Sequence, residues 1–166
     1  MFKIIQMNVN FKDVQLAVDD RESLLDTLRH RLNLTSVKKG CEVGECGACA
    51  VLIDGKVVNT CTYLAVNADG KKILTVEGLR GEDGGLHPIQ QAFVDEAAVQ
   101  CGFCTPGFIM TALEIVSQDR DFTREEIMKL ISGHLCRCTG YENIINAILK
   151  VNANRKAILE NNLLYK

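Results

Sequence analysis

Apolar and polar residues alternate along the first part of the chain. Within residues 3–18 the apolar positions recur at every second residue, with a turn region at 8–12. This period is typical of strands with one buried face, so the segment predicts a β-hairpin. A helix is expected to begin at Asp19-Asp20 and to end near residue 30, because three leucines in this stretch share one helical face.

A second hairpin signal surrounds Asp54-Gly55. This pair separates two apolar segments, residues 50–53 and 56–60, and an Asp-Gly pair in that position favours a tight β turn. The elements expected next are a short strand or turn, a turn and a last strand, at 63–66, 67–70 and 73–76. Strands combined with one helix predict a small α+β unit over residues 1–78.

The pattern changes after a glycine-rich stretch at 79–85, which contains three glycines and two acidic residues and predicts a linker. Beyond it, apolar residues recur at helical spacing, so residues 86–166 predict an all-α unit. Thr123 and Glu126 have the spacing of a capping box at a helix start. The four expected helices lie at 88–99, 106–118, 123–133 and 141–155. Residues 156–166 form an uncertain tail, for which a continued helix stays open.

Composition and charge narrow the class of protein. The chain has 166 residues, enough for one medium domain or two small ones, and a formal net charge of −2. Without a basic run, the sequence gives no reason to expect nucleic acid or an anionic membrane as a partner. No apolar stretch is long enough to span a membrane, and the N-terminus lacks the apolar core of a signal peptide. We therefore expect a cytoplasmic protein, in which eight cysteines serve as metal ligands or redox groups rather than in disulfides.

The first four cysteines have a distinctive spacing. Cys41, Cys46 and Cys49 form C-x4-C-x2-C, and Cys61 follows after eleven residues. This is the pattern of plant-type [2Fe–2S] ferredoxins, in which a tight loop and a nearby strand end deliver four thiolates to two irons. Glycines at positions 40, 44 and 47 would let the loop wrap a cluster closely. Structural zinc, the alternative, usually shows two separated cysteine pairs rather than one tight triple.

The other four cysteines fall between the predicted helices. Cys101 and Cys104 form C-x2-C, and Cys136 and Cys138 form C-x-C after 31 intervening residues. Cysteines at helix N-termini gain from the positive end of the helix dipole. Spacing alone leaves a second cluster, zinc and a thioredoxin-like C-x-x-C open, although no βαβ pattern supports the last. Four cysteines suffice for a cluster, so no ligand role is expected for the histidines, and His30 is expected at the surface. The remaining two histidines are His87 and His134.

Three motifs together resemble a known family. They are Gly40–Cys49 (GCEVGECGAC), Gln100–Gly107 (QCGFCTPG) and Leu135–Tyr141 (LCRCTGY). In this order they closely resemble the iron–sulfur subunit of the xanthine dehydrogenase, or molybdenum hydroxylase, family, and the resemblance covers residues 3–150. It implies a β-grasp ferredoxin domain at 1–78 with a [2Fe–2S] cluster on the first four cysteines. It also implies a four-helix bundle after the linker, with a second [2Fe–2S] cluster on the other four.

The resemblance also implies partners and a direction of electron flow. The second cluster would lie near a molybdopterin in a separate large subunit, with Gln100 hydrogen-bonded to the pterin and Cys138 close to its amino group. The first cluster would face FAD in a medium subunit. Electrons would leave molybdenum, pass through both clusters to FAD, and reach an acceptor such as NAD. The chain itself would carry no catalytic residues, and it shows no catalytic triad or dinucleotide fingerprint.

Several alternatives stay open. The chain could be a free-standing electron carrier with two clusters, or a structural module held together by zinc. Arg137, between two of the cysteines, either raises the potential of its cluster or is a solvated or interface residue. Glu42 and Glu45 belong either to a solvated rim or to the contact with a flavin subunit. The loop around Cys41 looks slightly more like that of purine hydroxylases, which favours a purine as substrate of the complex.

Overall fold

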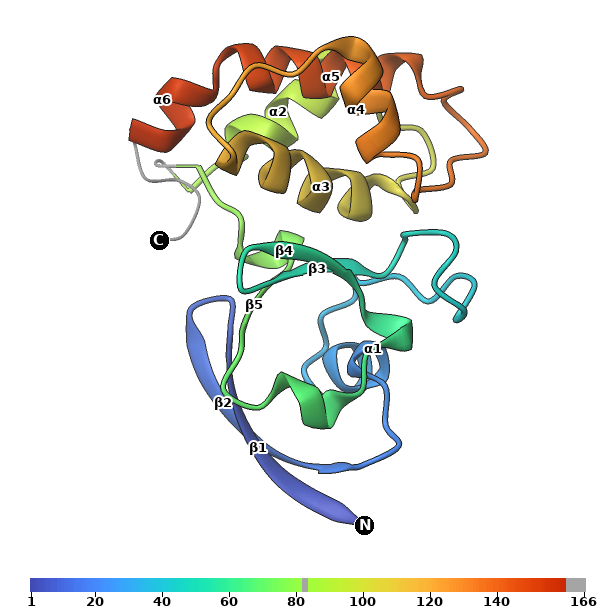
Figure 1. The fold of residues 1–166 in the computed structure, drawn as a ribbon, viewed down its shortest axis with the longest axis vertical. Helices are drawn as coiled ribbons and strands as arrows, with labels where there is room; N and C mark the ends of the chain where they lie inside the picture. The colour runs from blue at the N-terminus through green and yellow to red at the C-terminus, as the bar shows by residue number, and fades with distance from the viewer. Residues whose placement is uncertain (82–83, 161–166) are drawn as a thin grey trace.

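The computed structural model describes residues 1–81 and 84–160 and contains a sheet and a layer of helices (Figure 1). The sheet has the order β2-β1-β5-β3-β4, in which β1 and β5 are parallel and the other neighbours are antiparallel. The strands are β1 (Phe2–Val9), β2 (Lys12–Asp19), β3 (Ala50–Ile53), β4 (Lys56–Asn59) and β5 (Lys72–Leu74). Both predicted hairpins are therefore confirmed. The last strand is shorter than predicted because the chain enters a 3-10 turn at Val76–Gly78.

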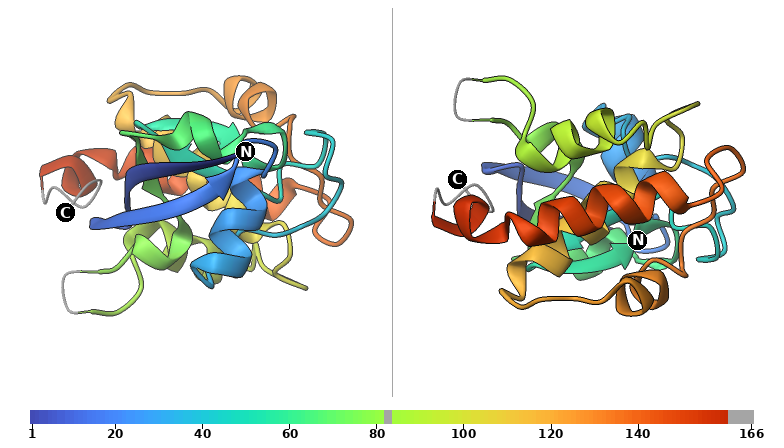
Figure 2. Two further views of the ribbon diagram at one scale, coloured as in Figure 1. Left: turned by 90° about the horizontal axis from the view of Figure 1, so that it is seen from below. Right: turned by 90° about the horizontal axis from the view of Figure 1, so that it is seen from above.

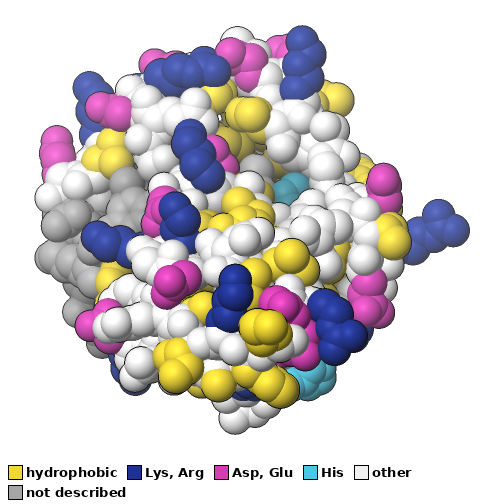
Figure 3. All heavy atoms as spheres, turned by 60° about the horizontal axis from the view of Figure 1, so that its bottom comes forward, with side chains coloured by type: hydrophobic (Ala, Val, Ile, Leu, Met, Phe, Trp, Pro, Cys, Tyr) yellow, Lys and Arg dark blue, Asp and Glu magenta, His cyan; other side chains and the backbone are white. Residues whose placement is uncertain are grey.

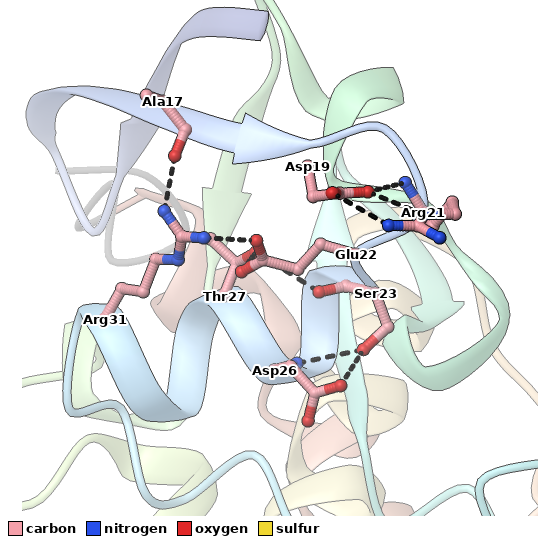
Figure 4. Close-up of polar contacts among 8 residues, drawn as sticks. All are labelled: Ala17, Asp19, Arg21, Glu22, Ser23, Asp26, Thr27 and Arg31. Carbon is pink, nitrogen blue, oxygen red and sulfur yellow. Dashed lines mark hydrogen bonds and ion pairs between the residues drawn. The ribbon is translucent and has the colours of Figure 1, made fainter. Parts of the chain in front are cut away.

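The helix beneath this sheet begins later than the sequence predicted. Asp19 still belongs to β2, and α1 (Leu24–Asp26) starts after Ser23 and continues into a π-helical turn at Thr27–Arg31. The Ser23 hydroxyl accepts the Asp26 N–H at 3.0 Å, a regular N-cap (Figure 4). The prediction of Asp19-Asp20 as the start was wrong because Asp19 still pairs with β1 as part of β2. Its Oδ1 accepts the Arg21 Nε–H at 3.0 Å.

Side chains of the π-helical turn after α1 form hydrogen bonds and an ion pair with residues of β2 and of the segment that follows it. Arg31 Nη2 lies 2.5 Å from Glu22 Oε2, and its Nη1 donates to the carbonyl of Ala17 on β2. Thr27 Oγ1 donates to Glu22 Oε1 at 2.8 Å (Figure 4). The apolar face of α1 and of the π-helical turn packs on the buried side of the sheet, where Leu24, Leu25 and Leu28 are almost fully buried. The helix therefore supports the loop that follows it.

The helical layer contains α2 (Pro88–Asp95), α3 (Thr105–Ser117), α4 (Arg124–Leu130), α5 (Glu142–Ala153) and α6 (Arg155–Glu160). Helix α5 contacts α2, α3 and α4, and it runs across the layer in the right-hand view of Figure 2. The capping box predicted at Thr123 and Glu126 is present. The uncertain tail is helical as far as residue 160, and 161–166 lie outside the described residues, as do 82–83 of the predicted linker.

Helix α2 ends four residues before its predicted end. Ala97 has φ of 50°, the left-handed conformation that ends helices. The N–H of Ala98 donates to the carbonyl of Phe93, and that of Ala97 to Val94, which together form a Schellman motif. Glycine usually occupies this left-handed position, so the sequence carried no sign of the helix end.

The two layers meet at helix α3, which packs on β3 and β4. Glu114 of α3 lies at the β4 edge of the sheet, where its carboxylate accepts the Val57 N–H at 2.8 Å and lies 3.3 Å from Lys56 Nζ. One buried cluster lies between the sheet and α1, and another lies among the helices and includes Leu52 and Leu74 from the sheet. No helix among the described residues is long and apolar enough to cross a membrane. On the face shown in Figure 3, acidic and basic side chains are interspersed.

Candidate functional site

The first four cysteines gather at one end of the sheet. Cys41 and Cys46 lie in the loop between α1 and β3, and Cys49 is buried just before β3. The β3–β4 hairpin returns the chain to this loop, where Thr60 Oγ1 donates to the carbonyl of Cys49 at 2.9 Å. Cys61 follows in a 3-10 turn, and its side chain interacts with that of Cys49. The structure therefore brings the predicted set together.

The loop directs backbone amides at a sulfur. The N–H groups of Val43, Glu45 and Cys46 lie 3.5, 3.3 and 3.4 Å from Cys41 Sγ. These hydrogen bonds lower the pKa of Cys41 to about 6, because they stabilise the thiolate, and the bond from Val43 has the largest effect. A Cβ on Gly40 would lie 2.9 Å from Cys46 Sγ, so a side chain at that position would crowd the loop.

The Cys61 thiol shows that the four cysteines need a bound cation before all of them can ionise. Burial, followed by the proximity of Cys49, raises the pKa of Cys61 to about 11. Several thiolates in one small space repel one another, so a cation is needed to hold all four in the ionised form. The donor set thus fits a group with positively charged irons. In the part of the chain that the structure describes, no three His, Cys, Asp or Glu side chains have the arrangement that would hold a single metal ion.

The second cysteine set is gathered from two loops of the helical layer. Cys104 is buried at the N-cap of α3, and its side chain interacts with that of Cys136. The side chains of Cys101 and Cys138, both exposed, interact in the same way. Burial, followed by the Cys136 side chain, raises the pKa of Cys104 to about 12. Here too, converging thiols need a cation before all can ionise.

The C-x-C loop is held by two residues that the sequence analysis had not singled out. Thr139 directs its N–H at Cys136 Sγ, at 3.4 Å, with its hydroxyl at 3.2 Å. The Cys136 N–H in turn donates to the hydroxyl of Tyr141 at 2.9 Å. Tyr141 has φ of 70° and stands directly before α5, so this pair of cysteines is not at a helix N-terminus. Of the second set, Cys104 alone occupies a cap of a described helix.

The cysteine-bearing loops project at the same end of the molecule, on the right in Figure 1 and in both views of Figure 2. They are in direct contact, because the Leu135 N–H donates to the carbonyl of Cys46 at 3.0 Å. Gln100 and Arg137 are exposed there. Phe103 and Leu135 are also exposed, at 46% and 59%, whereas Phe108 and Ile109 belong to the core.

The three histidines lie in different environments. His30 is exposed, as predicted. His87 is buried at the start of α2, where Nδ1 accepts the N–H of Ile89 at 3.1 Å. His134 is buried beside the second cysteine set, with Nε2 2.6 Å from Thr111 Oγ1. Burial lowers the pKa of His134 to about 4, so its ring is neutral at physiological pH. The sequence did not reveal that this residue is buried.

A fold with a sheet, a helical layer and two gathered sets of cysteines defines an iron–sulfur protein with two cluster-binding parts. Family models agree with this class. Residues 7–75 match a 2Fe-2S iron-sulfur cluster binding domain, and residues 75–149 match a [2Fe-2S] binding domain. The chain thus contains two [2Fe–2S]-binding domains.

Known proteins resemble the chain over most of its length. It is 49% identical to the nicotine 6-hydroxylase small subunit of Paenarthrobacter nicotinovorans, over 87% of each chain. It is 46% identical to the xanthine dehydrogenase iron-sulfur-binding subunit of Escherichia coli O157:H7, over 87% of this chain and 91% of the relative. The crystal structure of quinoline 2-oxidoreductase from Pseudomonas putida 86 matches with a TM-score of 0.88 and 43% identity, over 94% of this chain and 97% of that one. The chain belongs to the xanthine dehydrogenase, or molybdenum hydroxylase, family, as an iron–sulfur subunit of an oxidoreductase.

Proposed function

We propose that this chain carries electrons between a molybdopterin-containing large subunit and an FAD-containing medium subunit. The observation that supports this most directly is the contact between the two cysteine-bearing loops, through the Leu135–Cys46 hydrogen bond of 3.0 Å. Two one-electron centres held on touching loops suit a relay. Each [2Fe–2S] cluster, when bound, would accept and release one electron.

The proposed ligands of the first cluster are Cys41, Cys46, Cys49 and Cys61, and those of the second are Cys101, Cys104, Cys136 and Cys138. The gathering of each set and the mutual perturbation of its thiols support this assignment. We also infer domain limits at 1–78 and 86–166, with 79–85 as linker. The four longer helices, α2 to α5, would correspond to the four-helix bundle of the family. The matches to the two family models meet at residue 75, close to this division.

The chain's own residues would act on the clusters through hydrogen bonds and charge. Amides directed at Cys41 Sγ, and Thr139 directed at Cys136 Sγ, stabilise negative charge on sulfur. Such bonds favour the reduced, more negative cluster and raise its potential. Arg137 is exposed between two proposed ligands. We predict that its positive charge raises the potential of the second cluster. An unchanged potential in the Arg137→Gln variant would exclude this role.

The two partners would meet different loops. Cys138, Cys101 and Gln100 are exposed, which leaves them within reach of a pterin held by the large subunit. Exposed Phe103 and Leu135 beside them provide apolar contact area. The medium subunit would cover the loop around Cys41, whose exposed Val43 is adjacent to an ion pair between Lys39 and Glu42 at 3.0 Å.

For the substrate of the complex, the relatives favour a nitrogen heterocycle. Relatives are named for nicotine and caffeine at 49% identity, and for nicotinate at 47%. Two of these names carry a pyridine substrate and one a purine, at nearly the same identity, so the identities give the purine no advantage. We also place the protein in the cytoplasm, a setting that suits eight cysteines free of disulfides.

Gentle affinity purification of the chain from its native cell tests the proposal. We expect two further subunits, molybdenum, flavin and about four irons per copy of this chain, as two [2Fe–2S] clusters require. A lone chain with the same iron and no molybdenum would favour the free-standing carrier and overturn the proposal. A colourless protein that contains zinc would overturn it in favour of a structural module.

A further inference from the structure

His134 lies where the two cysteine-bearing loops meet. Its side chain is buried, with Nε2 bonded to Thr111 Oγ1 of α3 at 2.6 Å. The ring also packs on Phe108 of α3, with 4.9 Å between the ring centroids. Nδ1 lies against Gly47, whose backbone interacts with the ring. One imidazole therefore touches the first cysteine loop and helix α3, whose N-cap is Cys104.

Two glycines make this close approach possible. A Cβ on Gly47 would lie 2.2 Å from His134 Nδ1, which is far closer than such atoms can come. A Cβ on Gly107 would lie 2.3 Å from the Gly47 carbonyl oxygen and 3.1 Å from His134 Nδ1. The backbone of the first loop therefore rests directly on α3, with the imidazole beside both.

Each member of this group is close in sequence to a proposed ligand. Gly47 follows Cys46, Gly107 comes three residues after Cys104, and His134 comes two residues before Cys136. A displacement at this junction must therefore move cysteines of both sets relative to each other. Protein interiors are packed closely enough to transmit such a shift.

We propose that His134, seated against Gly47 and Gly107, is a positioning residue that fixes the second cysteine set at its distance from the first. This inference rests on the proposed ligand assignment. It gives a reason for a buried histidine beside the cysteines that does not involve ligation. It also assigns the separation of the two clusters to packing of this chain alone, not to the partner subunits.

The test measures the magnetic interaction between the clusters in the intact, dithionite-reduced complex by electron paramagnetic resonance. Each reduced cluster is paramagnetic, and the interaction weakens steeply with distance. Gly107→Ala is the sharpest variant, because Gly107 lacks a positive φ and the added methyl meets the Gly47 carbonyl. Gly133→Ala is the matched control, since a Cβ there meets nothing within 4 Å.

We expect Gly107→Ala and His134→Ala to lose a large part of the splitting while both clusters stay bound, and Gly133→Ala to match the wild type. His134→Gln, which can still bond Thr111, should fall between His134→Ala and the wild type. Wild-type splitting in His134→Ala, with both clusters present, would overturn the inference even if Gly107→Ala failed to assemble. A wild-type complex without two iron–sulfur signals would instead overturn the proposed function.

Discussion

The two cysteine sets are built in different ways. In the first, three amides of one continuous loop surround Cys41 Sγ, and a hairpin returns Cys61 to that loop. In the second, two loops 31 residues apart meet only because helices α3, α4 and α5 pack together. The first site therefore depends on local sequence, and the second on a core that is built elsewhere.

This difference predicts that core damage affects the second set before the first. Phe108 is fully buried and packs on His134 and on Tyr141, 6.2 Å between centroids. Phe108→Ala should cost about 3–5 kcal/mol of stability. On heating the complex, we expect the signal of the second cluster to disappear first, as followed by electron paramagnetic resonance of samples taken at each temperature.

The control for this experiment is Phe2→Ala on β1. Phe2 is 70% exposed, so its truncation should change the melting temperature little. Loss of both clusters together in the Phe108→Ala complex would show that the two sets share one cooperative unit, contrary to the comparison.

A smaller effect is expected from the hydroxyl that supports the C-x-C loop. Tyr141→Phe removes the acceptor of the Cys136 N–H, which should cost about 1 kcal/mol. We expect the potential of the second cluster to change and that of the first to stay constant, measured by redox titration of both signals. Tyr63→Phe is the matched control, since its hydroxyl bonds the carbonyl of Asn67 at 2.8 Å, away from the second set. Equal changes at both clusters would contradict a local role for Tyr141.

An effect of similar size, but one that acid removes, concerns Glu77, which bonds Ser36 just before the first loop. Glu77 is partly buried, which raises its pKa, but the hydrogen bonds from Ser36 and Thr75 outweigh burial and lower the pKa below 4.5. The stability that these bonds add is therefore present above pH 4.5 and is lost as the pH falls through the folded-state pKa. Glu77→Gln should cost about 1 kcal/mol at pH 7 and less in acid. Urea unfolding of the complex at pH 7 and pH 4 measures this, and a pH-independent cost would exclude the carboxylate as the cause.

The same difference explains what the sequence could predict. The hairpins follow from local patterns and were confirmed. The cysteine spacings are also local patterns, and the ligand sets that they indicate stay a prediction. The start of α1 after Ser23 does have a local signal, because Ser23 and Asp26 have the spacing of a helix cap, and the prediction overlooked it. The end of α2 depends on a left-handed Ala97, which no local signal marks. Burial of His134 and the hydroxyl of Tyr141 on Cys136 arise from tertiary packing alone. Residues 139–141 (TGY) follow Cys138 in the sequence, but their spacing does not indicate that two of them bond Cys136.

The most direct test of the account is to count iron and sulfide in the purified complex after one cysteine of each set is replaced. Cys61→Ser should remove the first cluster and Cys104→Ser the second, so that each variant keeps about two of four irons and loses a different paramagnetic signal. This result would assign one cluster to each set. Loss of all iron in both variants, or no loss in either, would contradict two independent sites.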